Sequence, residues 1–277
     1  MKKILFFLIF IQFISAEIRI PGDDISQVSS MTFLKKGPNG SKLYRIEAPD
    51  SVYASTDLPY LLDLTAKTSY EQGYDAGYLL GKEAVENYNN LFVKLLGNKW
   101  WRSIVSEIVG LFLDEQWNNY LSKDVPQSYL DEVKGISDGA YSAHRIKNVG
   151  KLITRAIVLS NLPGTLDNFK FIIEDETKNT NTNSYNWLQF ISGPYIIQFL
   201  SKISSYWKGL SCSMFGVWGS RTLNGELFSG RNLDWLTNTG ISKYKLITIH
   251  RPPDGYVHCT VGWAGFWGAI TGMSIEG

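Results

Sequence analysis

The residues most able to do chemistry in this sequence surround a cysteine that begins a run of strand-forming residues. Cys212 starts the stretch Cys212–Trp218, and a polar stretch with Arg231 and Asp234 follows after a turn. A thiolate is a strong nucleophile when a neighbouring group accepts its proton or stabilises its charge. The spacing therefore indicates a cysteine nucleophile served by an arginine and an aspartate that return toward it.

Two bases are available to this thiol. One is a histidine, and His258 would form a dyad with Cys212. The other is the α-amino group that Cys212 would carry after cleavage of the Ser211–Cys212 bond. Such groups titrate near pH 7.7–8.0, and N-terminal serine and threonine enzymes use the same arrangement. We favour the α-amino group, with Asp234 orienting it and Arg231 stabilising the thiolate or binding an anionic group. Arg231 and Asp234 would face opposite sides of a regular strand, so we expect a bend at residues 232–233.

A disulfide is the alternative use of the cysteines. The chain has two, Cys212 and Cys259, and the pair could form one bridge in an oxidising compartment. A non-catalytic secreted domain held by this bridge is therefore a rival hypothesis.

Composition bounds the class of protein. The 277 residues suffice for one large domain or two small ones. A net charge of +1 with 19% charged residues gives no electrostatic footprint for nucleic acid. We expect no metal and no cofactor.

The N-terminus is typical of a secretory signal peptide. Residues 1–16 contain two lysines, an apolar run too short to span a membrane and a final Ser-Ala. An N-terminal anchor is the alternative. Asn39 begins the sequon Asn39-Gly40-Ser41, a predicted glycosylation site. These features predict a secreted or lysosomal protein.

Periodicity and turn residues predict helices first and strands afterwards, the order of an α+β protein. Helices are expected at 69–96, 103–121, 127–145 and 149–161, and strands at 32–34, 42–46, 59–64, 213–218, 227–228, 244–250, 256–261 and 266–273. The later strands should form an antiparallel sheet, joined in part by a hairpin at Asn224-Gly225. Residues 178–184 are expected to form a disordered loop. The apolar segment 185–200 is expected to be buried, with a lipid-contacting lid as the alternative.

Glycines in the helical section suggest close packing. Gly73, Gly77 and Gly81 lie four residues apart, on one helix face, which predicts another backbone against that face. Gly135–Gly139 matches the G-x-S-x-G pattern of serine hydrolases, but that motif needs a preceding strand. We interpret it as part of a helix.

Several motifs together resemble the linear-amide cysteine hydrolases of the N-terminal-nucleophile superfamily. They are Cys212-Ser213-x-Phe215, Trp218-Gly219-Ser220-x-Thr222-x-x-Gly225 and Gly230-Arg231-Asn232-Leu233-Asp234-Trp235, with weaker likeness at 61–64, 70–77 and 265–273. The chain looks most like the branch of acyl-coenzyme A:6-aminopenicillanic acid acyltransferase and acid ceramidase.

The resemblance implies an αββα sandwich and self-cleavage between Ser211 and Cys212. Residues 17–211 would be a helical α-part (a propeptide or α-chain) and 212–277 the start of a catalytic β-part, with the two remaining associated. Cys212 would be the nucleophile, Arg231 and Asp234 would complete the catalytic group, and Asn232 and Trp235 would contact substrate. Relatives take an oxyanion asparagine from later strands, so we expect the chain to be truncated at its C-terminus.

The sequence thus predicts a secreted or lysosomal cysteine amidohydrolase that cleaves a linear amide through a Cys212 thioester. The expected substrate is an N-acyl lipid resembling ceramide, and contact with a membrane surface stays open. The second hypothesis is a truncated or inactive relative that acts as a non-catalytic secreted domain.

Overall fold

The computed structural model describes residues 31–47, 58–96, 102–160, 212–233, 240–252 and 254–274. The expected signal peptide, the polar run at 178–184, the apolar segment at 185–200 and three expected site residues lie outside these ranges; the three are Ser211, Asp234 and Trp235. Helices and strands both contribute to the described part, which confirms the α+β class.

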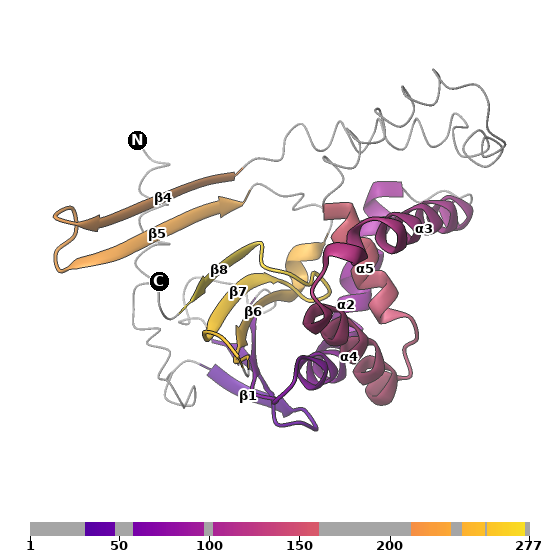
Figure 1. The fold of residues 1–277 in the computed structure, drawn as a ribbon, viewed down its shortest axis with the longest axis horizontal. Coiled ribbons are helices and arrows are strands. Elements are labelled where there is room, and N and C mark those ends of the chain that lie inside the picture. Colours follow the sequence, from indigo (N-terminus) through magenta and orange to yellow (C-terminus); the bar gives the residue numbers. More distant parts are fainter. Residues whose placement is uncertain are drawn as a thin grey trace, which may run out of the picture.

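A six-stranded sheet forms the centre of the described structure (Figure 1). The strand order is β1-β2-β3-β6-β7-β8, and every neighbouring pair is antiparallel except β3–β6, which is parallel. The strands are β1 (Met31–Lys36), β2 (Lys42–Ile46), β3 (Tyr60–Leu64), β6 (Lys245–His250), β7 (His258–Trp263) and β8 (Thr271–Ser274). The sequence predicted each of these strands, although β8 begins later than expected.

The α-helices of the described ranges follow β3 in the chain and cover one face of the sheet. They are α2 (Ser69–Leu96), α3 (Arg102–Asn119), α4 (Gln127–His144) and α5 (Val149–Ser160), with 3-10 helices η3 (Leu121–Asp124) and η5 (Ile241–Tyr244). Figure 1 shows them on one side of the sheet, with the separate hairpin of β4 (Cys212–Gly219) and β5 (Gly225–Leu233) beyond the other side. The predicted helix positions are confirmed. Among the described helices, none is long and apolar enough to cross a membrane.

The expected antiparallel pairing of the later strands is confirmed for β6, β7 and β8 and for the hairpin of β4 and β5, but the main sheet also contains the early strands, one of which pairs parallel. Strands β3 and β6 run parallel, with Leu62 opposite Thr248, because the helical section lies between them and returns the chain to the same end of the sheet. The sheet therefore takes three strands from each side of the expected cleavage point at 211. The expected α-part and β-part would therefore each contribute three strands to one shared sheet.

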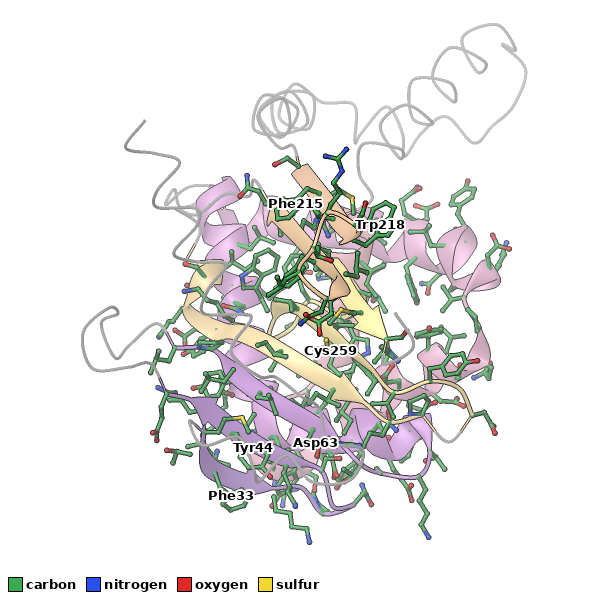
Figure 2. The ribbon with its side chains drawn as sticks, turned by 90° about the vertical axis from the view of Figure 1, so that its left-hand side faces the viewer. Phe33, Tyr44, Asp63, Phe215, Trp218 and Cys259 are labelled. Atoms are coloured by element: carbon green, nitrogen blue, oxygen red, sulfur yellow. The ribbon has the colours of Figure 1, made fainter. Side chains whose placement is uncertain are left out.

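The two faces of the sheet differ in what covers them. On the helical face, Leu62, Leu64 and Leu246 pack with buried residues of α2, α4 and α5. On the other face, a smaller cluster is built around Tyr44, Leu61 and Ile249, with Cys259 at its edge. Figure 2 looks onto this second face and labels Phe33, Tyr44 and Cys259 there. Phe33, Val261 and Met273, all on strands, remain largely exposed.

Helices α2 and α4 touch through their backbones. A Cβ atom built on Gly73 would lie 2.0 Å from the carbonyl oxygen of Glu132, and one on Gly77 would lie 2.0 Å from that of Ile136. Gly81 faces Ala140 in the same register, so the two helices run in the same direction. The predicted close approach of another backbone to this glycine face is confirmed.

The G-x-S-x-G pattern supplies the other half of this contact. Gly135 and Gly139 lie within α4, as interpreted, and Cβ atoms there would come within 2.1 Å of the Tyr70 carbonyl oxygen and 1.9 Å of that of Tyr74. These glycines are therefore required by helix packing.

A polar cluster lies where α4 meets the loop between β7 and β8, and in it Glu132 is buried while His250, His258 and Trp267 are half-buried. Burial raises the pKa of Glu132 to about 7, although the indole of Trp267 donates a hydrogen bond to its carboxyl group. The His250 ring lies edge-on to Trp267, with ring centroids 6.4 Å apart, and stacks on His258 at 4.7 Å. Burial, together with the charge of His258, lowers the pKa of His250 to about 4.

We expect Gly77→Ala to destabilise the protein even though alanine is the better helix former by about 1 kcal/mol. The added methyl group would overlap the Ile136 carbonyl oxygen, and neither helix backbone can yield without breaking the contact. The measurement is the free energy of unfolding in urea. Gly150→Ala in α5 is the matched control, because the nearest atoms to its methyl group, Ser137 Cβ and the Val133 carbonyl oxygen, would lie 3.2 and 3.3 Å away. Equal effects of the two substitutions would contradict the packing argument.

We also expect Glu132 and His250 to change the free energy of unfolding with pH in opposite directions, so that their effects partly cancel. As pH rises from 4.5 to about 7, Glu132 loses its proton in the unfolded state first, so the free energy of unfolding falls, by roughly 3 kcal/mol. From about pH 4 to 6.5, His250 has lost its proton in the folded state but keeps it in the unfolded state, so the free energy of unfolding rises by a similar amount.

Replacing one of the two residues should leave only the contribution of the other to the pH dependence of the free energy of unfolding. Glu132→Gln should make stability rise with pH between about 4.5 and 6.5, whereas His250→Gln should make it fall. Urea unfolding at three pH values in this window measures both slopes. Parallel curves for the two variants would refute the assignment, whatever their absolute stabilities.

Candidate functional site

Cys212 lies at the first position of a two-stranded hairpin. Strands β4 and β5 pair antiparallel from Cys212–Leu233 to Gly219–Gly225, outside the six-stranded sheet. The sequence predicted this hairpin, but its connection is longer than an Asn-Gly turn. Residues 220–224 form successive turns, in which the amide of Thr222 bonds the Gly219 carbonyl and that of Gly225 bonds the Thr222 carbonyl. Gly219 and Gly225, at positive φ, take the positions that favour glycine.

The hairpin register brings Cys212 and Arg231 together. Leu233 is directly opposite Cys212, and Arg231 lies two residues earlier, on the same face of the ribbon. A diagonal neighbour of this kind is within reach of a long side chain. The Nη2 atom of Arg231 donates to Cys212 Sγ at 3.4 Å. The arginine therefore presents its charge to the sulfur.

The same guanidinium group binds the main sheet. Arg231 Nη1 donates to Thr271 Oγ1 at 2.8 Å and to the Ile270 carbonyl oxygen, both at the start of β8. Within the described part of the chain, no carboxylate forms an ion pair with Arg231. Its positive charge is thus directed at the thiol and at neutral oxygens.

The expected bend at residues 232–233 is wrong. Asn232 pairs with Ser213 and Leu233 with Cys212, so the ladder continues to the end of β5. Asn232 consequently stands on the face of the ribbon opposite Cys212. Its role at a substrate site stays a prediction, and those of Ser211, Asp234 and Trp235 fall on residues outside the described ranges.

The histidine alternative is not formed among the described residues. His258 stacks on His250 across the β6–β7 pairing, and its Nδ1 lies 3.1 Å from the Tyr256 carbonyl oxygen. Cys212 contacts Arg231 instead. The two histidines thus pair with each other across the turn that joins β6 and β7.

The disulfide alternative is wrong in this structure. Both cysteines are free: Cys212 is exposed at the start of the hairpin, and Cys259 is half-buried on β7. Cys259 packs with the apolar cluster on the uncovered face of the sheet. Cys212 is thus the more accessible thiol.

The predicted glycosylation site lies in the turn between β1 and β2, and Asp75 of α2 holds that turn. Asp75 accepts bonds from the backbone amide of Asn39 at 2.9 Å, from its side-chain Nδ2 at 3.1 Å and from the amide of Ser41 at 2.9 Å. Ser41 is fully buried. If Asn39 carries a glycan, we expect it to be attached before this turn packs against α2.

Thr271 is a site residue that sequence reasoning missed. It lies within the Gly265–Met273 likeness, but a threonine on a short strand carries no sign of a partner on a separate hairpin. Only the placement of β8 beside β5 identifies it.

Comparisons with known proteins add a short local similarity. No protein-family model matches the chain. Part of the chain is similar to the protein dcd1B of Dictyostelium discoideum, with 35% identity over 66 residues. This stretch is 23% of the present chain and 13% of the length of dcd1B. No solved structure matches the chain.

We expect the two thiols to react at different rates in the native protein. Brief iodoacetamide treatment should add one label, at exposed Cys212, and labelling in urea should add two. Mass spectrometry of the intact chain and of its peptides measures both. Cys212→Ala should abolish the fast label and Cys259→Ala should retain it. A native protein that takes no label until it is reduced would contradict the free thiols.

Proposed function

We propose that this chain belongs to a cysteine amidohydrolase that cleaves a linear amide through a thioester at Cys212. The observation that carries the proposal is the contact between Arg231 Nη2 and Cys212 Sγ at the start of an exposed hairpin. An arginine beside a thiol favours the thiolate, which is the nucleophilic form. The family motifs around the two residues agree with this use.

In the proposed activation, the Cys212 sulfur attacks the carbonyl carbon of Ser211 and the peptide nitrogen takes up a proton and leaves. This produces a thioester to Ser211 and a free α-amino group on Cys212. Water then hydrolyses the thioester, which releases the Ser211 carboxylate and restores the thiol. The new amine can act as a general base because it lies within the same residue as the thiol.

In the proposed turnover, the amine takes the thiol proton, and the sulfur attacks the amide carbonyl of the substrate. The leaving amine receives that proton, and the acyl group stays on Cys212 as a thioester. A water molecule, deprotonated by the same amine, releases the acid. Arg231 orients the sulfur throughout. Asp234 would hold the α-amine, and Asn232 and Trp235 would contact the substrate.

An N-acyl lipid is the proposed substrate. Apolar side chains stand exposed on the hairpin that carries Cys212, among them Met214 at 81% and Trp218 at 65% of their full exposure. Met214 is directly opposite Arg231 in the ladder. Such a surface suits an acyl chain beside the reacting sulfur. The signal-like N-terminus supports a secreted or lysosomal location.

An αββα sandwich is the proposed architecture of the whole protein. Two features support it: helices cover one face of the main sheet, and the other face and the hairpin carry exposed apolar side chains. A lone two-stranded hairpin is marginally stable in water, so a further layer would stabilise β4 and β5.

Contacts across the proposed cleavage point indicate that the two fragments would stay associated. Asp63 of β3 pairs with Arg251 at 2.9 Å, and Gln72 of α2 donates to the Arg251 carbonyl oxygen at 2.8 Å. The side-chain Nδ2 of Asn87 donates to the Ala264 carbonyl oxygen, also at 2.8 Å. These bonds supplement the parallel ladder between β3 and β6.

The full chain, expressed through a secretory pathway, should separate under denaturing conditions into two fragments, the second beginning at Cys212. The two should co-elute in gel filtration. Cys212→Ala should stay intact and lose hydrolysis of a fluorogenic N-acyl amide. Intact mass and N-terminal sequencing after incubation at acidic and neutral pH measure the cleavage. A wild-type chain that remains whole at both pH values and lacks hydrolysis would favour the non-catalytic alternative.

A further inference from the structure

We propose that Thr271 is a positioning residue that holds Arg231 against the Cys212 sulfur, so that the reactivity of the thiol depends on a side chain of the main sheet. This inference rests on the proposed function of Cys212. It adds a residue to which none of the motifs assigns a role.

Arg231 needs an anchor because its side chain is long and exposed. Holding such a side chain in one rotamer costs conformational entropy. A single exposed contact to a sulfur atom would not hold it. The hydroxyl of Thr271 and the carbonyl of Ile270 both accept from Nη1, and the Nη2 atom is then directed at Cys212. Because the guanidinium group is planar and rigid, fixing one nitrogen places the other.

Thr271 is suited to this role by its own position. It pairs with Val261 in the β7–β8 ladder and is therefore part of the six-stranded sheet. Its β-branched side chain has few rotamers on a strand, so the position of its hydroxyl group is restricted even without the contact to Arg231. Cys212 and Arg231, by contrast, both belong to the separate hairpin. The Thr271–Arg231 bond thus connects the nucleophile to the rigid part of the fold.

The test uses the rate at which iodoacetamide alkylates Cys212, in a Cys259→Ala background so that one thiol is followed. Thr271→Val removes the hydroxyl at nearly constant shape, and Thr271→Ser retains it. At about pH 6.5, where few ordinary thiols are ionised, Thr271→Val should slow alkylation about three- to tenfold, the worth of one hydrogen bond. Thr271→Ser should react at the rate of the parent.

Two further measurements separate positioning from a structural effect. At about pH 10, where ordinary thiols are ionised, the parent and Thr271→Val should react equally, because accessibility is unchanged. Arg231→Met should slow the reaction at the lower pH at least as much as Thr271→Val, and the double variant should be no slower than Arg231→Met alone. Circular dichroism and urea unfolding confirm that each variant is folded.

The proposal is overturned if Thr271→Val reacts like the parent at the lower pH, if its effect adds to that of Arg231→Met, or if it slows alkylation equally at both pH values. These outcomes do not depend on turnover. Failure of self-cleavage with the expected alkylation pattern would reject the proposed function and retain Thr271 as the anchor of Arg231. Normal self-cleavage of the wild-type chain, with Thr271→Val alkylated at the parent rate, would retain the proposed function and reject Thr271 as the anchor of Arg231.

Discussion

The parallel pairing of β3 with β6 joins strands that lie on either side of the helical section, and the remaining structure is arranged around it. With these strands side by side, β1 and β2 extend the sheet in one direction and β7 and β8 in the other. The helices between β3 and β6 must then cover a face of the sheet they connect. The same pairing places the start of β8, with Thr271, where Arg231 of the hairpin can reach it.

The close backbone contact between α2 and α4 is the second constraint, and it determines where the carboxyl group of Glu132 is buried. Because Gly73 and Gly77 let α2 lie directly against α4, Glu132 is carried into the interior, where Trp267 supplies its hydrogen bond. Burial shifts the pKa of Glu132 upward and that of His250 downward. The cluster therefore favours neutral forms of both groups at mildly acidic pH, which avoids the cost of buried charge.

The guanidinium group of Arg231 connects the hairpin to the main sheet. Arg231 makes one contact to the sulfur from within the hairpin, and two contacts to β8 from outside it. The first follows from strand register, since Cys212 and Arg231 are diagonal neighbours on one face. The second depends on two sheets lying beside one another. Under the proposed function, the reactivity of Cys212 would respond to changes in the main sheet that never touch the sulfur.

Local patterns in the sequence determined the helices, nearly all strand positions, the glycine contact of α2 and the meeting of Cys212 with Arg231. Each of these follows from periodicity or from a short turn, so neighbouring residues suffice to specify it. Tertiary structure alone decided the parallel β3–β6 pairing, the straight course of β5 through Leu233, the burial of Glu132 and the contact of Thr271 with Arg231. These features depend on which strands become neighbours across the helical section. The apolar faces of the sheet and of the helices must be buried against one another, and this burial selects the neighbours. No single segment contains that information.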